Sequence, residues 1–427
     1  MKFLIKIIFV ISLTLKINVS NANTLFNSLE SAFSKNSKLN AERANMRASI
    51  EEKRESVSEF LPSVTISGYV SDQQNTKTNG SDSNFKPAEQ SMTVEQKIFQ
   101  GGSGVASFMK KKHGQSLGEY KLLKTLQDTL LEAAKAHTSV QLNRKKVNIN
   151  LINIDLLESQ VETDQNRLEK GQISLTDLAQ SEASLAGARA QLIAAQNELV
   201  TSISNFEKII GEKPSKDFEE IEVNNLNLPE SLASAYEISK KNNPDLQIAF
   251  LEYKQSKLDV VIAGSDLSPS ATLKYKVAEQ ENMSATIKDR TQQSVTATAS
   301  WPLFAGGKNL FSLRKAQELR NQKELLFEDS KKQTEIDVAN AWSNYQSSKS
   351  VLDSISSQVK AAEIANEGIT LEYESGNKRT TLEVIQSRTI LLNSRINLAN
   401  SERNFLISQF NLLSAVGKLT DKHLNLK

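Results

Sequence analysis

Hydrophobic residues recur at every seventh position in a stretch of the chain that occurs twice. The large residues are Leu178, Leu185, Leu192, Leu199 and Phe206 in the first copy and Val384, Leu391, Leu398, Phe405 and Leu412 in the second, 206 positions later. Three positions after most of them stands an alanine or a serine. This heptad spacing predicts two long helices, over about 175–210 and 381–416. Because the small residues let backbones approach closely, we expect several helices to lie side by side as a wall.

Two still longer segments without proline precede these helices, at about 103–170 and 308–375. Apolar residues are again spaced by sevens, for example at Val140, Val147 and Ile154. At about 1.5 Å per residue, each segment predicts a helix of about 100 Å. Glycines, Gly171 and Gly376, stand where the chain must turn back into the second helix of each pair.

Apolar and polar residues alternate in four shorter runs, at about 62–74, 91–100, 269–280 and 291–303. The alternation predicts strands with one apolar and one polar face, joined in pairs by polar loops over 75–90 and 280–290. The residues expected on the apolar, lipid-facing side are Val64, Ile66, Leu273, Val277, Val295 and Ala297. The turn residues at the ends of these hairpins are Pro62, Gly101, Gly102, Pro269, Gly306 and Gly307.

The order of these elements repeats, which predicts one architecture built twice. A first repeat over 23–211 and a second over 231–417 are expected, with a polar linker over 212–230 and a polar tail over 418–427. Residues 1–22 have a basic start, an apolar core too short to span a bilayer and small residues at the end, as is typical of a secretory signal peptide. We therefore expect a mature chain that begins at Asn23; a membrane helix is the alternative for this segment.

Composition narrows the possible functions. Lys+Arg number 52 and Asp+Glu number 50 in 427 residues, a balance that gives no electrostatic case for a nucleic-acid partner. Only 38% of the residues are hydrophobic and 6% aromatic, so long helices that share thin seams fit better than a thick globular core. The chain has no cysteine, which excludes thiol catalysis and cysteine-ligated metal.

No constellation of residues predicts catalysis, a cofactor or a metal site. His113, His137 and His423 are scattered among polar residues, and we expect all three on the solvated surface. Gly101-Gly102-Ser103-Gly104 resembles a phosphate loop, but no Lys-Ser or Lys-Thr follows at the required place. The sequence therefore predicts a protein without enzymatic activity.

The four predicted strands have the length of a membrane crossing, which takes about 9 to 11 residues. Four strands are too few to close a barrel, and unpaired edges are prohibitive in lipid, so other copies of the chain must complete the sheet. Three copies would supply twelve strands, within the usual range of outer-membrane barrels. The alternative, a soluble antiparallel sheet on a helical bundle, leaves helices of about 100 Å unexplained.

Together these features resemble the TolC family of outer-membrane efflux proteins. The resemblance rests on the duplicated helix, the Asn242-Asn243-Pro244-Asp245-Leu246 box, the Pro-Ser strand openings and the Phe-x-Gly-Gly strand ends, and it covers essentially the whole mature chain. It implies a mixed α and β membrane protein. In this arrangement a homotrimer forms a 12-stranded β-barrel in the outer membrane of a Gram-negative cell, continuous with a long α-helical barrel in the periplasm.

The resemblance also implies a function and partners. Such proteins are passive channel-tunnels of tripartite efflux or type I secretion systems, which export small molecules or proteins. The implied partners are outer-membrane lipid, a periplasmic membrane-fusion adaptor and an inner-membrane ABC or proton-driven pump. The adaptor would dock at the hairpin tips, formed by Gly171, Gln172, Ile173, Ser174, Leu175, Gly376 and Asn377. Two competing classes are a non-conducting periplasmic coiled-coil scaffold or adhesin and a diffusion porin, but porins put nearly all residues into strands.

A periplasmic aperture is implied near the second hairpin tip. The residues that the resemblance assigns to it are Thr176, Asp177, Tyr373, Lys378, Arg379, Glu383 and Gln386. Tyr373 and Arg379, or Lys378 in place of Arg379, would be a locking pair that faces Thr176 and Asp177. Glu383 would line the aperture, whereas Gln386 stands where a second acidic residue is expected, which weakens a double cation-binding ring. The same residue types are also typical of helix caps and exposed surface.

Overall fold

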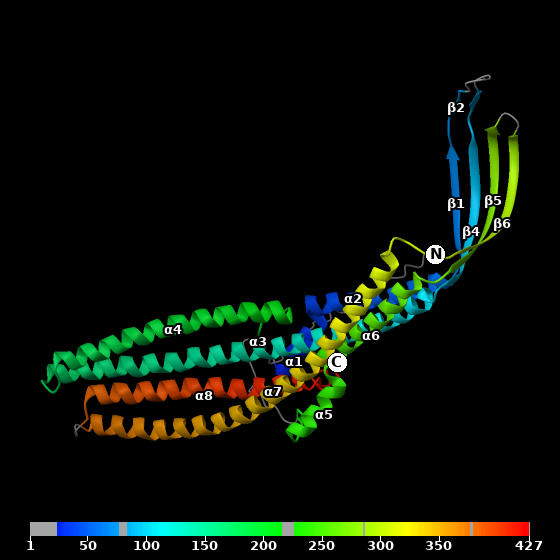
Figure 1. The fold of residues 1–427 in the computed structure, drawn as a ribbon. Coiled ribbons are helices and arrows are strands. Elements are labelled where there is room, and N and C mark those ends of the chain that lie inside the picture. The colour runs from blue at the N-terminus through cyan, green and yellow to red at the C-terminus, as the bar shows by residue number, and fades with distance from the viewer. Residues whose placement is uncertain (1–23, 77–82, 216–225, 285–286, 376–378, 427) are drawn as a thin grey trace, which may run out of the picture.

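The computed structural model describes residues 24–76, 83–215, 226–284, 287–375 and 379–426. Its elements are, in chain order, α1 Leu25–Lys35, α2 Ser37–Glu55, η1 Ser56–Phe60, β1 Ser63–Val70, β2 Gln73–Asn75, β3 Ser83–Phe85, β4 Ala88–Gln100, α3 Ser103–Glu169, α4 Leu175–Ile210, α5 Leu232–Asn242, α6 Pro244–Ser265, β5 Ser270–Ser284, β6 Ile287–Ser300, α7 Lys308–Glu374 and α8 Thr381–Ala415. The expected signal peptide, 1–22, lies outside the described residues. Figure 1 shows an elongated molecule, with the sheet at one end and the tips of two helical hairpins at the other.

Two antiparallel hairpins of long helices form the end opposite the sheet. α3 packs against α4, α7 packs against α8, and the hairpins meet through α3 and α8 (Figure 1). α3 and α7 have 67 residues each, which corresponds to about 100 Å of helix. The small residues buried on α4 are Ser181, Ala188, Ala195 and Ser202. Their size keeps the seam between paired helices thin, as the heptads predict.

The change from strand to helix occurs at the two glycine pairs. Gly101 and Gly102 have φ angles of +60° and +88°, and Gly306 and Gly307 have φ angles of +61° and +81°. A Cβ atom on Gly101 would lie 2.7 Å from the Cβ atom of Ser268, so a larger residue would displace its neighbours. The left-handed backbone favours glycine at all four positions, and at Gly101 the close approach requires it as well. α3 and α7 begin directly after the pairs.

The four main strands form one antiparallel sheet in the order β1-β4-β5-β6. The two strand hairpins therefore meet through β4 and β5, which belong to different halves of the chain. Pro62 and Pro269 immediately precede β1 and β5, where the missing N–H breaks no ladder bond. Within the described residues, the outer edges of β1 and β6 have no paired strand.

The register places apolar residues of the four strands in common rows. One row consists of Val64, Val94, Tyr275 and Val295, and the next contains Ile66, Met92 and Val277. Cross-strand partners share a face of the sheet, so these rows form an apolar band on one side. In the single chain, Val64 is 62% and Val295 70% exposed. The band is thus available for contact with lipid.

The opposite face of the sheet is polar. Lys274 lies 3.1 Å from Glu95, and Lys276 lies 2.5 Å from Glu89, in both cases between β5 and β4. Alternation along the strands therefore separates an apolar side from a side that carries ion pairs.

The second strand hairpin extends beyond the alternating pattern. A polar loop is expected over 280–290, but β5 continues to Ser284 and β6 begins at Ile287. There Gln280 lies opposite Arg290 and Glu281 opposite Asp289. Main-chain hydrogen bonds extend the ladder between polar residues, because these bonds do not depend on apolar side chains. In the first hairpin β1 ends at Val70, and the short pair of β2 and β3 lies beyond it.

The largest hydrophobic core joins the short helices to the long ones. Leu29 of α1, Leu130 of α3, Phe206 of α4 and Phe410 of α8 are fully buried in it. The expected polar tail over 418–427 is not solvated throughout, because Leu419 is buried in the same core. A few apolar residues in a short segment are enough to anchor it against an existing core.

His137 is buried, so the expectation that all three histidines lie on the solvated surface is wrong. Its side chain is 0% exposed, its Nδ1 lies 2.8 Å from the hydroxyl of Ser28, and its ring packs beside Phe206. α1 and α4 cover this side of α3, which the spacing along α3 alone does not reveal. Burial, assisted by the charge of Arg144, lowers the pKa of His137 to about 4. His423 is half-buried and donates from Nε2 to the carbonyl of Leu226 at 2.9 Å.

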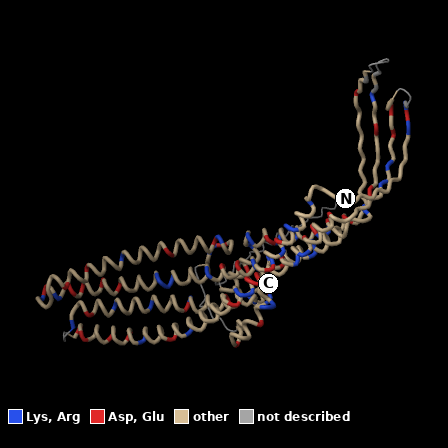
Figure 2. Tube along the Cα trace, viewed as in Figure 1, with Lys and Arg blue, Asp and Glu red and all other residues tan. Residues whose placement is uncertain are grey.

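Charged residues of both signs are interspersed along the long helices, as Figure 2 shows. This distribution fits the near-equal numbers of basic and acidic residues in the chain. In the described part of the chain, no helix has both the length and the apolar character needed to cross a bilayer.

Candidate aperture at the ends of the helical hairpins

The first hairpin turns at Gly171, which has a φ angle of +66°. The N–H groups of Gly171 and Gln172 donate to carbonyls in the last turn of α3, both at 2.9 Å. Ser174 and Asp177 then form a capping box at the start of α4, with the N–H of Ser174 donating to the Asp177 carboxylate at 3.0 Å. The bonds from Ser174 lower the pKa of Asp177. The exposed residues of this tip are Gly171, Gln172, Ser174, Leu175 and Thr176, and Ile173 is half-buried.

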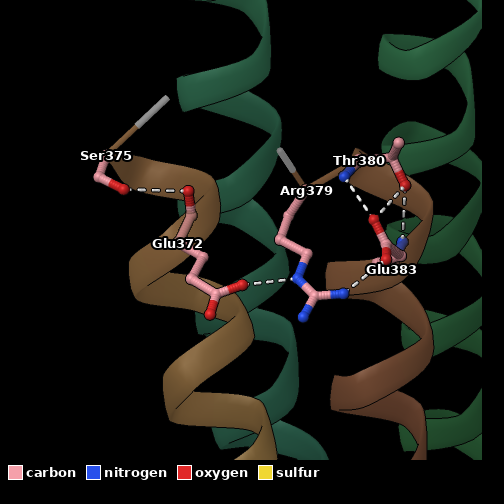
Figure 3. Close-up of polar contacts among 5 residues, drawn as sticks. All are labelled: Glu372, Ser375, Arg379, Thr380 and Glu383. Carbon is pink, nitrogen blue, oxygen red and sulfur yellow. Dashed lines mark hydrogen bonds and ion pairs between the residues drawn. The ribbon is translucent and has the colours of Figure 1, made fainter. Parts of the chain in front are cut away.

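Arg379 links the two helices of the second hairpin (Figure 3). Its guanidinium donates to Glu372 of α7 at 2.6 Å and to Glu383 of α8 at 2.9 Å. Glu383 also accepts from the N–H of Thr380 at 2.8 Å and completes the capping box of α8. The bond from that N–H and then the Arg379 guanidinium lower the pKa of Glu383, so the side chain is charged at neutral pH. The predicted residues Gly376, Asn377 and Lys378 lie outside the described residues.

A buried carboxylate joins the two hairpins close to their tips, on the side toward the sheet. Asp164 of α3 is 0% exposed. It accepts hydrogen bonds from Gln160 at 2.9 Å, from Ser181 of α4 at 2.5 Å and from the hydroxyl of Tyr373 of α7 at 2.6 Å. The Tyr373 hydroxyl also lies 3.0 Å from the hydroxyl of Thr381 on α8. All four long helices therefore meet at one hydrogen-bonded cluster.

Two arginines stand at this cluster. Arg167 donates to the main-chain carbonyl of Tyr373 at 3.0 Å, and its guanidinium carbon lies 4.3 Å from the centre of the Tyr373 ring. Arg388 of α8 donates to the carbonyl of Leu156 at 3.1 Å, and burial lowers its pKa. Burial and the hydrogen bond to Asp164 raise the pKa of Tyr373, so its hydroxyl stays protonated and can donate.

Tyr373 has a different partner in the chain from the one expected. The resemblance places Tyr373 opposite Thr176 and Asp177, but its hydroxyl bonds to Asp164, and Asp177 caps its own helix. A helical side chain tilts toward the N-terminus of its helix, so Tyr373 points away from the tip and reaches α3 before the turn. Arg379 likewise pairs within its own hairpin, and Gln386 is exposed on α8.

Sequence reasoning does not single out Asp164, although a signal for it exists. Asp164 stands three positions after Val161, which belongs to the seven-residue series of α3, so it occupies the second core position of that heptad. A charged residue at a core position requires a partner when it is buried. Its counterpart on α4, Ser181, also occupies a core position of the heptads.

Comparison with known proteins agrees with this architecture. A family model described as "Outer membrane efflux protein" matches residues 28–212 and 235–418. The chain belongs to this family. The outer membrane efflux protein BepC of Brucella suis biovar 1 (strain 1330) is 24% identical over 417 residues, 95% of this chain and 88% of BepC. The outer membrane protein TolC of Escherichia coli (strain K12) is 23% identical over 438 residues, 99% of this chain and 88% of TolC.

Solved channels share the fold at low sequence identity. The outer membrane channel CmeC of Campylobacter jejuni superposes with a TM-score of 0.84 at 13% identity, covering 93% of this chain and 86% of CmeC. The outer membrane protein VceC of Vibrio cholerae superposes with a TM-score of 0.81 at 16% identity, covering 92% of this chain and 96% of VceC. This outer membrane efflux protein therefore has the efflux-channel fold, and its place is the outer membrane.

Proposed function

We propose that three copies of this efflux protein form a passive export duct. Twelve strands, four from each chain, close a barrel in the outer membrane, and the long helices continue as an α-helical barrel through the periplasm. The two halves of the chain act as an internal repeat, and each contributes one strand hairpin and one helical hairpin.

The sheet is the observation that carries this proposal. Within the described residues β1 and β6 have open outer edges, although one face of the sheet carries exposed apolar rows. A sheet with open edges is not viable in lipid, because each unpaired main-chain group costs several kcal/mol there. When β6 of one copy pairs with β1 of the next, neither of these two strands keeps an open edge. In a closed ring of copies, no strand of the sheet has an open edge.

The hairpin tips are the proposed docking site for a periplasmic adaptor. They are the ends of the molecule farthest from the sheet (Figure 1), and the first tip exposes Leu175 at 70%. Through the adaptor the duct would receive small molecules or proteins from an inner-membrane pump, either an ABC transporter or a proton-driven pump. The pump supplies the energy, so a duct of this kind needs no catalytic group or cofactor of its own.

The polar cluster near the tips is the proposed aperture. Asp164 and Tyr373 tie the two hairpins together, and Arg379 and Glu383 place charge beside them. Polar links of this kind can keep an entrance narrow and still allow it to widen. The hydrogen bonds at the cluster can break and re-form with other partners, while the apolar contacts between the paired helices nearer the sheet stay intact.

Conductance of the purified protein in planar lipid bilayers tests the duct. We expect heat-resistant trimers that insert and conduct ions, with heat-denatured protein as the control. A periplasmic coiled-coil scaffold or adhesin would form oligomers that neither insert nor conduct, and that result would exclude the duct.

A further inference from the structure

The two longest helices are unequally covered near the sheet. α3 packs against α2 and against α6, whereas α7 packs against α6 but against no second helix equivalent to α2 among the described residues. The long and short helices and the main strands follow in the same order in the two halves, so the helix that α7 lacks corresponds to another α2. In a second copy of this chain, α2 is such a helix.

The contact between α3 and α6 shows how such a pair is held. Lys110 lies 2.6 Å from Asp259, and Lys124 forms an ion pair with Asp245. On each helix the two charges stand fourteen positions apart, on the same face. The helices run in opposite directions, so both pairs form at once.

Two pairs of equivalent residues align the first half of the chain with the second, and so relate this contact to α7 and α2. The glycine pairs that precede α3 and α7 are 205 positions apart. Asn36 and Asn243 cap α2 and α6 in the same way, each accepting from the N–H three residues later, and they are 207 positions apart. Each position on α3 therefore has an equivalent 205 later on α7, and each position on α6 has one 207 earlier on α2.

The equivalents keep both charge pairs complementary. On α7 the positions equivalent to Lys110 and Lys124 are Lys315 and Asp329. On α2 the positions equivalent to Asp259 and Asp245 are Glu52 and Lys38. One pair keeps its polarity, Lys315 with Glu52, and the other reverses it, Asp329 with Lys38. All four side chains are exposed. Within the described residues Lys38, Lys315 and Asp329 form no ion pair, and Glu52 pairs with Lys111 at 2.8 Å.

Side-chain size is complementary as well. Between α3 and α6, Gln255 lies against Gly114, and a Cβ atom on that glycine would lie 3.3 Å from the Gln255 amide nitrogen. The equivalent positions hold Leu319 on α7 and Ala48 on α2, so the large residue has moved to the other helix. Leu319 is 48% exposed, and Ala48 is exposed.

We infer that α7 of one copy receives α2 of the next copy in the register in which α3 receives α6. Lys315 pairs with Glu52 of the next copy, Asp329 pairs with Lys38 of the next copy, and Leu319 packs on Ala48 of the next copy. This inference rests on the proposed trimer and internal repeat. Contacts of the two kinds then alternate around the ring, with one kind inside each chain and the other between chains.

Cysteine crosslinking tests the register, because the chain has no cysteine of its own. The full-length protein carrying Lys38→Cys and Asp329→Cys is treated in the membrane with a short bismaleimide. We expect a ladder of covalent dimers and trimers on a denaturing gel. Co-expression of the two single variants should give only covalent dimers, which proves that the link joins different chains.

Two matched pairs control this experiment. Lys124→Cys with Asp245→Cys occupies the equivalent contact inside one chain, and mass spectrometry should find one crosslinker that consumes both thiols of a monomer. Lys38→Cys with Lys349→Cys places the second thiol on α7 twenty residues beyond Asp329, about 30 Å away, and should give no ladder.

Charge reversal provides a second measurement. Asp329→Lys places two lysines together and should reduce the trimer fraction roughly fivefold, and adding Lys38→Glu should restore it. Conducting trimers without the expected crosslink, or without rescue, would overturn this register while leaving the export duct standing. A chain that stays monomeric and does not conduct would overturn both.

Discussion

The hydroxyl of Tyr373 donates a 2.6 Å hydrogen bond to the carboxylate of Asp164, which lies 209 positions earlier in the chain. The bond joins α7 to α3 and thereby joins the two helical hairpins. Both groups are buried, so water cannot replace the bond at no cost. We expect this bond to break when the proposed aperture widens.

Replacing Tyr373 by phenylalanine removes this link. Loss of a hydrogen bond to a charged group typically costs about 1.5–3 kcal/mol, and Tyr373→Phe should lower the thermal stability of the helical part accordingly. It should also raise single-channel conductance, and addition of Arg379→Ser should raise it further. Tyr345→Phe is the control, because Tyr345 lies on the same helix and stacks on Phe405 of α8. Parent-like conductance in both Tyr373 variants would show that the aperture lies elsewhere.

Glu383 should influence ion selectivity. Glu383→Gln removes one charge per chain but retains an acceptor for the capping box of α8, so the helix should stay intact. We expect lower cation selectivity and weaker block by trivalent cations, measured as reversal potential and current in planar bilayers. Glu207→Gln, an exposed site on α4 about 45 Å from the tip, serves as the control. Unchanged selectivity in Glu383→Gln would remove this residue from the conduction path.

The two faces of the sheet should respond differently to charge. Val295→Lys places an ammonium group in the apolar row and should cost about 2–4 kcal/mol of folding free energy in lipid if the site lies near mid-membrane. Thr298→Lys, on the polar face of the same strand and opposite Thr272, should be tolerated. Urea titration of the protein folded into vesicles measures both values. Equal losses for the two variants would contradict the assignment of a lipid-facing side.

Stability of the helical core should fall in mild acid because of His137. Its pKa is lowered to about 4 in the folded chain from an ordinary value of 6.5, so the unfolded chain binds the additional proton. The neutral form therefore stabilises the fold fully above about pH 6.5, and this contribution is lost as the pH falls toward 4, by on the order of 3 kcal/mol. In His137→Gln the thermal midpoint should vary less over this window. Val140→Ala, a buried change without a titrating group, should lower the midpoint similarly at every pH.

The hairpin tips should contact the adaptor. A photo-crosslinking group at Leu175 should capture the adaptor in cells, because that side chain is exposed at the end farthest from the sheet. The same group at Lys86, beside the strands at the opposite end, is the control and should capture none. Capture at Lys86 but not at Leu175 would mean that the molecule has the opposite orientation.

The periodicity of the sequence predicts the long helices and the four main strands of this protein, but not β2, β3 or the extension of β5 and β6 into the expected loop. A spacing of seven with small residues between large ones predicts the long paired helices, and alternation predicts the strands, because both patterns follow from local backbone geometry. The positive φ angles at Gly101 and Gly307 are likewise local, since glycine alone adopts them without strain. The heptads show that Asp164 is a charged residue at a core position, but they do not show which residues form hydrogen bonds with it.

Which distant residues meet depends on how the elements pack against one another. The direction of the Tyr373 side chain along α7 sends it to Asp164 instead of Asp177, and the cover of α1 and α4 buries His137 against Ser28. The register of β4 against β5 also joins residues that are far apart in the chain, such as Val94 and Tyr275, which are 181 positions apart. Each of these outcomes depends on how whole elements pack in space, whereas periodicity reports only which face of a single element is apolar. Local backbone geometry thus accounts for the long helices, the main strands and the glycine turns of this efflux protein, whereas the hydrogen-bonded cluster that ties its hairpins together depends on packing.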